Sequence, residues 1–373
     1  MSRRYLAGFV QAGLFNPLVA PTPTYLYNLY SWGNNSSGRL GLNNRTNYSS
    51  PKQVGALTTW LNITAGRFSL ATKTDGTLWS WGENSQGQLG FGNITYYSSP
   101  KQVGSLTTWS NTTAGDSHTI ATKTDGTLWS WGLNNLGQLG LGNRTIYSSP
   151  KQVGSLTTWL SITAGSKFSL ATKTDGTLWS WGENDNGQLG LNNRTPYSSP
   201  KQVGALTTWL NISAVSTFNL ATKTDGTLWS WGNNNVGQLG LGNRTIYSSP
   251  KQVGALTTWL NISAGAYHSI VTKTDGTLWS WGRGSFGELG LGNITYYSSP
   301  KQVGSLTTWS NTTAGAYHTL ATKTDGTLWS WGRANSGELG LNNLTNYSSP
   351  KQVGALTTWT KISSRSISTI ALG

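Results

Sequence analysis

The chain repeats one short segment, Thr177-Leu178-Trp179-Ser180-Trp181-Gly182, together with the turn Thr174-Asp175-Gly176 that precedes it. A degenerate copy, Asn28-Leu29-Tyr30-Ser31-Trp32-Gly33, comes first in the series. Near-identical copies surround five further tryptophans: Trp81, Trp131, Trp231, Trp281 and Trp331. The copies are spaced by about 50 residues, a fixed period typical of repeat architectures. We therefore interpret the sequence as seven copies of one structural unit.

Each unit has the pattern of three or four short antiparallel strands. Asp175-Gly176 between two apolar runs is a strong hairpin signal, because glycine accepts a positive φ. Alternation places Trp179 and Trp181 on one face of the third strand and predicts that both faces of that strand are buried.

The flanking strands of the unit are also predicted from alternation. In the first strand we expect Leu160, Ile162 and Ala164 to share one face. A short fourth strand is expected to begin at Val203, after a proline suited to an edge position.

The two ends of the repeat array are complementary. Residues 29–32 form a third strand without its first two, and residues 359–372 supply a first and a second strand without a third. The counts balance if these ends pair, with Leu29, Trp32 and Ile370 at the closure. The sequence thus predicts an all-β, seven-bladed β-propeller over residues 28–373, closed by pairing of the N-terminal and C-terminal strands.

Composition limits the chemistry of the chain. It contains 20 Trp, 47 Gly and no Cys, and 10% of its residues are charged. Such a composition favours turn-rich β-structure and excludes disulfides and thiolate metal sites. His118, His268 and His318 occupy repeat positions that hold Phe in other copies, which indicates packing. We find no pattern for a catalytic group, a metal or a cofactor, and we predict a protein that is not an enzyme.

The formal net charge is +14. Each repeat contributes one lysine to a predicted ring of like charges: Lys52, Lys101, Lys151, Lys201, Lys251, Lys301 and Lys351. Such a ring could attract a polyanion, or it could keep a tryptophan-rich protein soluble. The even spacing favours the second interpretation, so nucleic acid is not an expected partner.

Variation between the copies is concentrated in the loops after each Trp-Gly pair. Loops on a rigid scaffold commonly carry recognition. We therefore take Leu133, Leu136, Arg283, Phe286 and Arg333 as candidate interaction residues. Neutral drift in unconstrained loops explains the same pattern, and both explanations stay open.

The segment from Gly315 to Gly332, Gly-Ala-Tyr-His-Thr-Leu-Ala-Thr-Lys-Thr-Asp-Gly-Thr-Leu-Trp-Ser-Trp-Gly, resembles the repeat of the regulator of chromosome condensation family. The resemblance extends over residues 28–373 and implies a seven-bladed propeller that acts as a binding platform. Members that exchange nucleotides on the GTPase Ran carry insertions that this chain lacks. Plant ultraviolet-B photoreceptors use a Gly-Trp-Arg-His-Thr motif that is also missing here, so neither activity is expected.

Residues 1–27 lie outside the repeat and are predicted to form a docking arm followed by a proline-rich linker. Arg3, Arg4, Tyr5 and Phe9 are its candidate contact residues. The segment resembles the leaders of virion structural proteins of marine tailed phages. It does not have the pattern of a cleaved signal peptide, and no run in the chain is long enough to span a membrane.

These observations together predict a virion structural or surface-binding protein, located on the particle surface or tail. The arm would contact other virion subunits, and the propeller would be displayed toward a host-surface protein or glycan. The alternative is a soluble protein-interaction module, extracellular or cytoplasmic, that regulates or inhibits a partner protein.

Overall fold

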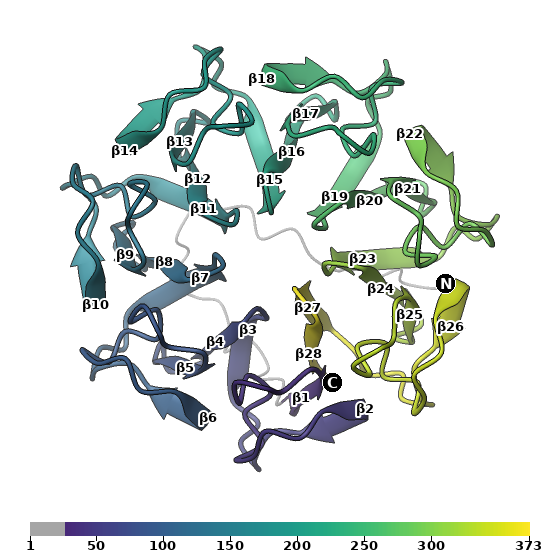
Figure 1. Cartoon of the computed structure of the whole chain (residues 1–373), viewed down its shortest axis with the longest axis horizontal. Coiled ribbons are helices and arrows are strands. Elements are labelled where there is room, and N and C mark those ends of the chain that lie inside the picture. Colours follow the sequence, from purple (N-terminus) through teal and green to yellow (C-terminus); the bar gives the residue numbers. More distant parts are fainter. Residues whose placement is uncertain (1–26) are drawn as a thin grey trace, which may run out of the picture.

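The computed structural model describes residues 27–373, which form 28 β-strands and no helix. The strands are arranged in seven four-stranded sheets around a central axis, as Figure 1 shows. This arrangement is a seven-bladed β-propeller, and it confirms the predicted fold.

The innermost strands of the blades are β3 (Trp60–Thr64), β7 (Trp109–Ala114), β11 (Trp159–Ala164), β15 (Trp209–Val215), β19 (Trp259–Ala264), β23 (Trp309–Ala314) and β27 (Lys361–Arg365). The second strands are β4 (Phe68–Lys73), β8 (His118–Lys123), β12 (Phe168–Lys173), β16 (Phe218–Lys223), β20 (His268–Lys273), β24 (His318–Lys323) and β28 (Ser368–Leu372).

The third strands are β5 (Leu78–Gly82), β9 (Leu128–Gly132), β13 (Leu178–Gly182), β17 (Leu228–Gly232), β21 (Leu278–Gly282), β25 (Leu328–Gly332) and β1 (Leu29–Gly33). The outermost strands are β6 (Tyr97–Gln102), β10 (Tyr147–Gln152), β14 (Tyr197–Gln202), β18 (Tyr247–Gln252), β22 (Tyr297–Gln302), β26 (Tyr347–Gln352) and β2 (Tyr48–Gln53).

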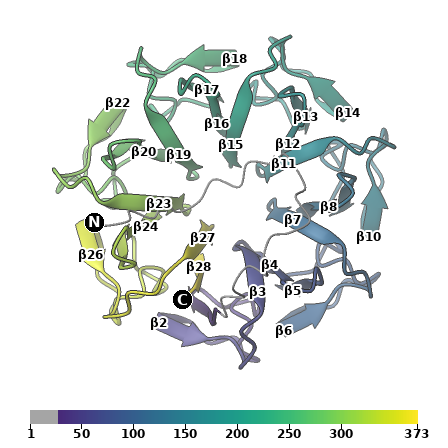
Figure 2. The same ribbon diagram turned by 180° about the vertical axis from the view of Figure 1, so that it is seen from behind.

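Blades 1 to 6 are each built from four consecutive strands, starting with β3–β6 and ending with β23–β26. Blade 7 is composite and has the strand order β2-β1-β28-β27. In it Leu29 pairs with Leu372, Ser31 with Ile370 and Trp32 with Thr369. Seen from behind in Figure 2, the purple and yellow ends of the chain meet in this blade. The predicted closure by Leu29, Trp32 and Ile370 is therefore confirmed.

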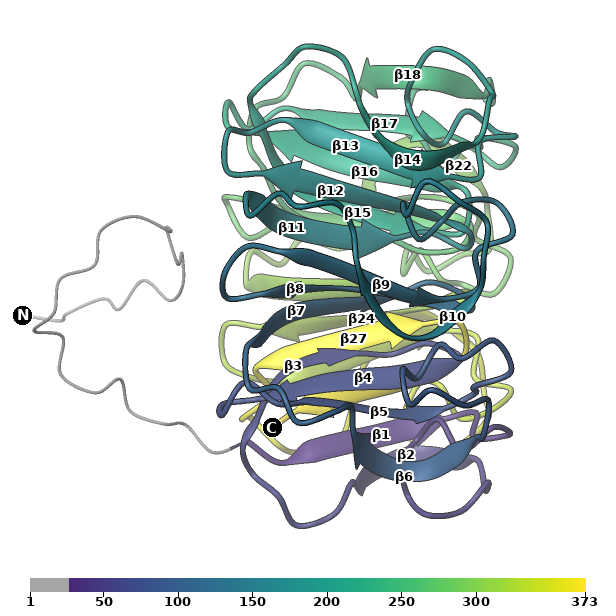
Figure 3. The same ribbon diagram turned by 90° about the vertical axis from the view of Figure 1, so that its left-hand side faces the viewer.

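In blades 1 to 6 an aspartate holds the turn before the third strand. In blade 3 the Oδ1 atom of Asp175 accepts hydrogen bonds from the Thr177 main-chain N–H at 2.9 Å and from its hydroxyl at 2.6 Å. Gly176 has a φ of +76°, a conformation that side chains disfavour. The Asp-Gly pair thus fixes the hairpin between β12 and β13. Seen from the side in Figure 3, the propeller is a disc, and its strands run between the two faces of this disc.

The core lies between blades and is centred on the tryptophan that precedes the last glycine of each third strand. Trp181 is fully buried, and its indole N–H donates to the main-chain oxygen of Gln138 in blade 2 at 2.9 Å. A Cβ atom on Gly140 would lie 2.8 Å from the Trp181 Nε1 atom. A residue without a side chain is therefore required where the indole meets the preceding blade.

Two predictions about the flanking strands are wrong. Leu160 is 43% exposed, because the register of β11 shifts between Trp159 and Ile162 and turns the leucine outward. The fourth strand β14 ends at Gln202, and Val203 follows it as a buried residue whose N–H donates to the Leu178 oxygen at 2.8 Å. Pro200 lies within β14. Because this strand forms the outer edge of its blade, the N–H that proline lacks is not needed to pair with a further strand.

Candidate functional site

Two kinds of loop meet at one face of the disc. One connects the first and second strands of a blade, and the other follows the third strand. In blade 5 the Arg283 N–H donates to the Tyr267 main-chain oxygen at 2.9 Å, and in blade 6 the Arg333 N–H donates to the Tyr317 oxygen at the same distance. Main-chain bonds therefore place an arginine beside a tyrosine in both blades.

Aromatic rings join these two blades at the surface. The Tyr267 and Tyr317 rings are stacked with their centroids 5.8 Å apart, and Phe286 meets Tyr317 edge-to-face at 5.5 Å. We call Tyr267, Arg283, Phe286, Tyr317 and Arg333 the arginine–aromatic patch. Pairs of this geometry contribute stabilisation beyond their buried area.

Both guanidinium groups lie against these rings. The Arg283 Cζ atom lies 5.3 Å from the Tyr267 ring centroid, 5.0 Å from that of Phe286 and 5.1 Å from that of Tyr317. The Arg333 Cζ atom lies 4.5 Å from the Tyr317 centroid and 5.8 Å from that of Phe286. The arginine side chains are 22% and 18% exposed, so both remain open to a ligand at this face.

A buried glutamate lies close to each arginine. Glu338 makes a hydrogen bond to Arg333, whereas the Arg283 Nε atom donates to the Ser285 hydroxyl at 2.6 Å. The Arg333 Nε atom lies 3.0 Å from Glu338 Oε1, and the Arg283 Nε atom lies 3.7 Å from Glu288 Oε1. Glu288 Oε2 also accepts the Phe286 main-chain N–H at 2.7 Å. Burial raises the pKa of the Glu288 carboxyl to about 7, against the effect of its hydrogen bonds and of Arg283. The charge that faces Arg283 therefore changes near neutral pH.

The structure brings together three of the five loop residues singled out from the sequence, Arg283, Phe286 and Arg333. Leu133 and Leu136 follow β9 in blade 2, three blades before blade 5, and take no part in the patch.

Sequence reasoning missed the two tyrosines and the two glutamates of this site. A signal for the glutamates was present, because blades 5 and 6 change two positions together. Blades 5 and 6 have an arginine, Arg283 or Arg333, at the first of these positions and a glutamate, Glu288 or Glu338, at the second. Blades 1 to 4 have glutamine at the second position: Gln88, Gln138, Gln188 and Gln238.

The three histidines lie between blades, away from solvent. The His118 Nε2 atom is 3.0 Å from the Ser169 hydroxyl, and the His268 Nε2 atom is 2.8 Å from that of Thr319. Burial lowers the pKa of His118, His268 and His318 to about 3, so all three are neutral at physiological pH. Their burial agrees with the predicted packing role.

Residues 27–373 contain no cluster of three or more histidine, aspartate or glutamate side chains placed to hold a metal ion. No helix in this part of the chain is long and apolar enough to cross a membrane. Arg3, Arg4, Tyr5 and Phe9, the predicted docking-arm residues, lie outside the described residues.

Fold and surface together define a seven-bladed β-propeller of nearly identical blades with one asymmetric patch on one face. The RCC1-like domain matches residues 27–260, and the regulator of chromosome condensation (RCC1) repeat matches residues 275–322 and 325–372. A second description of that repeat matches residues 259–288 and 309–338. The chain belongs to the RCC1-like family, as its repeat predicted.

Solved structures with the same fold come from human and yeast. Human WBSCR16 is 22% identical, with a TM-score of 0.84 over 93% of this chain and 98% of its own. Prp20p from Saccharomyces cerevisiae, described with its binding to Gsp1p and histones, is 21% identical, with a TM-score of 0.82 over 94% and 93% of the two chains. In a structure with Kap60, yeast RCC1 (Prp20) is 20% identical, with a TM-score of 0.82 over 99% and 96%. A comparison with curated protein sequences finds no match.

Proposed function

We propose that this protein is a non-enzymatic protein-interaction module whose docking surface is the arginine–aromatic patch, and that binding there regulates or inhibits its partner. The observation that carries the proposal is the asymmetry of the patch. Blades 5 and 6 combine two arginines with three aromatic rings at one place on the face formed by the loops after the third strands.

The composition of the patch supports a protein ligand. Arginine and tyrosine are enriched among the residues that contribute most to protein–protein binding energy. The rings hold both arginines in place, so little side-chain entropy is lost on docking. One relative with this fold, yeast Prp20, binds proteins according to the descriptions of its two structures: Gsp1p and histones in one, and Kap60 in the other.

The described residues give little support to the other predicted roles. The relatives named above are human and yeast proteins, and they lend no support to a virion role. An enzyme is disfavoured because the three histidines are buried between blades.

The test compares two matched triple variants. Arg283→Ser, Phe286→Ser and Arg333→Ser remove the patch, whereas Glu183→Ser, Asn186→Ser and Asn233→Ser change the same repeat positions two blades earlier. Both variants and the parent chain are used for affinity capture with quantitative mass spectrometry, and a captured protein is then titrated in purified form. We expect the patch variant to weaken binding about 30-fold or more, corresponding to about 2 kcal/mol, and the control to bind like the parent. Equal binding by the two variants would contradict the proposal.

A further inference from the structure

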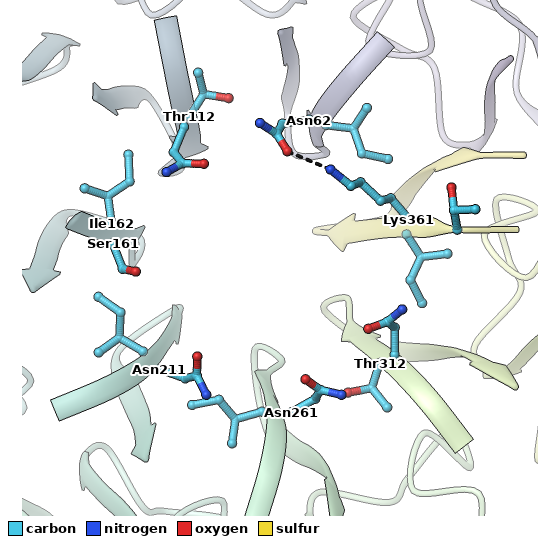
Figure 4. Close-up of a pocket in the computed structure, with 15 residues that line it drawn as sticks. Asn62, Thr112, Ser161, Ile162, Asn211, Asn261, Thr312 and Lys361 are labelled. Carbon is cyan, nitrogen blue, oxygen red and sulfur yellow. Dashed lines mark hydrogen bonds between the residues drawn. The ribbon is translucent and has the colours of Figure 1, made fainter. Parts of the chain in front are cut away.

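The seven innermost strands surround a cavity of about 610 Å³ on the propeller axis (Figure 4). Two consecutive positions of each first strand line it. The second position holds isoleucine in five blades and threonine in two, and the first position holds a polar residue in every blade. Five blades place an asparagine there: Asn62, Asn111, Asn211, Asn261 and Asn311. Blade 3 has Ser161 at this position, and blade 7 has Lys361. This volume suits a small molecule.

Neighbouring blades orient some of the carboxamides. The Asn62 Nδ2 atom donates to the Ser110 main-chain oxygen at 3.0 Å, and that of Asn261 donates to the Ser310 oxygen at 2.7 Å. No described residue donates to the Asn261 Oδ1 atom, which therefore remains as an acceptor. The Asn311 side chain has no hydrogen-bond partner among the described residues, so it can both donate and accept. The ring thus offers acceptors and donors to a ligand.

Lys361 breaks the symmetry of this ring. Its Nζ atom donates to the Leu61 main-chain oxygen at 2.7 Å and to Asn62 Oδ1 at 2.9 Å, which leaves one N–H unused. None of the described residues that line the cavity is Asp or Glu. Desolvation lowers the pKa of the Lys361 ammonium below its usual value, and no opposing charge offsets the shift. The cavity therefore holds a cation without a counter-ion.

A second cation from the same strand extends across the propeller axis. At one repeat position near the end of the first strand, five of the other blades have glycine and one has valine: Gly66, Gly115, Gly165, Val215, Gly265 and Gly315. Blade 7 has Arg365 there, which is buried. Its Nη1 atom donates to the Ala164 oxygen of blade 3 at 2.6 Å, across the axis, and its Nη2 atom lies 3.6 Å from Asp116 Oδ1 of blade 2. Arg365 thus reaches across the axis near the end where the first strands finish.

We propose that this axial pocket binds a small anion that carries several hydroxyl groups, and that a sugar acid is the chemical class that fits it. The Lys361 ammonium pairs with the carboxylate through its unused N–H. Hydroxyl groups both donate and accept, as carboxamides do, so the asparagine ring satisfies a polyhydroxylated ligand from several sides. A charge-assisted hydrogen bond is stronger than a neutral one, and Lys361 therefore determines the preference for an anion.

The experiment titrates the full chain with D-glucuronate, D-glucose and acetate by isothermal titration calorimetry. We expect saturable binding of glucuronate at one site, with glucose and acetate each bound at least tenfold more weakly. Lys361→Gln should weaken glucuronate about tenfold or more and leave glucose unchanged. Lys351→Gln removes the same charge from the outer strand β26 and should leave glucuronate binding as in the parent.

Lys361 also makes hydrogen bonds to blade 1, so its replacement could affect folding as well as binding. A second variant avoids this problem. Asn311→Asp preserves the size of a side chain that has no partner but adds a carboxylate to the ring, and it should abolish glucuronate binding without lowering the melting temperature. The proposal is overturned if glucuronate does not bind, if acetate binds as well as glucuronate, or if both cavity variants keep the parent affinity.

Discussion

The Trp32 indole N–H donates to the main-chain oxygen of Glu338 at 3.0 Å, although the two residues are 306 positions apart. The equivalent bond in blade 3 joins Trp181 to Gln138, 43 positions away, at 2.9 Å. One interaction thus connects each blade to its predecessor, and in blade 7 it joins the two ends of the chain. The bond from Trp181 joins residues of consecutive blades that are close in sequence, whereas the bond from Trp32 closes the ring.

Replacing Trp32 by alanine should loosen this closure. Truncation of a buried tryptophan costs about 3–5 kcal/mol, and here the loss falls where the ends are held by pairing of β1 with β28. We expect amide hydrogen exchange to accelerate in β1, β2, β27 and β28. Trp181→Ala, the matched control, should cost similar stability but leave exchange in blade 7 unchanged. The same exchange pattern in both variants would contradict this role of Trp32.

His118 should make the protein less stable in mild acid. Burial, together with the Arg365 charge, lowers the pKa of His118 to about 3, whereas the unfolded chain titrates near 6.5. As pH falls below about 6.5, His118 binds a proton in the unfolded state but not in the folded state. The free energy of unfolding therefore falls by about 1.4 kcal/mol per pH unit.

His118→Phe tests this by installing the residue that blade 3 has at the equivalent position, Phe168. Between pH 6.5 and pH 5, the variant should lose about 2 kcal/mol less of its free energy of unfolding than the parent. Denaturant unfolding at the two pH values measures the free energy of unfolding of both proteins. The contribution of the aspartates to the pH dependence is the same in both, so it cancels in the comparison. Identical pH dependence would show that the histidine is not held neutral.

Glu288 should have the opposite dependence on pH. Its folded-state pKa is raised to about 7, so the folded carboxyl holds a proton that the unfolded chain has already lost, and stability falls as pH rises from about 4.5 to 7. Glu288→Gln should remove this loss and gain about 2–3 kcal/mol on the parent between pH 5 and pH 8.

Gln238→Glu is the matched control for Glu288. It places a carboxyl at the same position of blade 4, where Asn233 stands in place of an arginine. We expect it to destabilise the protein at pH 8, because no guanidinium offsets the buried charge. A Gln238→Glu protein as stable as the parent at that pH would contradict the compensating role of Arg283.

Gly140 and Gly154 separate backbone strain from steric clash. Their φ angles are +74° and +62°, but a Cβ on Gly140 would lie 2.8 Å from Trp181 Nε1, whereas one on Gly154 would meet nothing within 4 Å. Gly154→Ala should therefore cost about 1–2 kcal/mol, the strain of a left-handed residue. Gly140→Ala should add about 1–3 kcal/mol of overpacking, measured by thermal unfolding. Equal costs would mean that the indole can move aside.

The sequence by itself determined the fold of this protein. Seven copies of the Trp-Ser-Trp-Gly strand set the number of blades, and the incomplete ends around Trp32 and Ile370 required a composite blade. These features are predictable because each repeat is a local unit and the ends must complement each other. The register shift that exposes Leu160 was not predictable, because a bulge moves side chains off simple alternation.

Only the tertiary structure decided which side chains gather at a site. Arg283 and Arg333 are one repeat apart in sequence, and adjacent blades bring both against the Tyr317 ring. Ala164 and Arg365 are 201 positions apart and meet across the axis. Repeat periodicity specifies neighbours within a blade and between consecutive blades, but closure of the ring creates the axis, and contacts across it depend on the radius and the individual side chains.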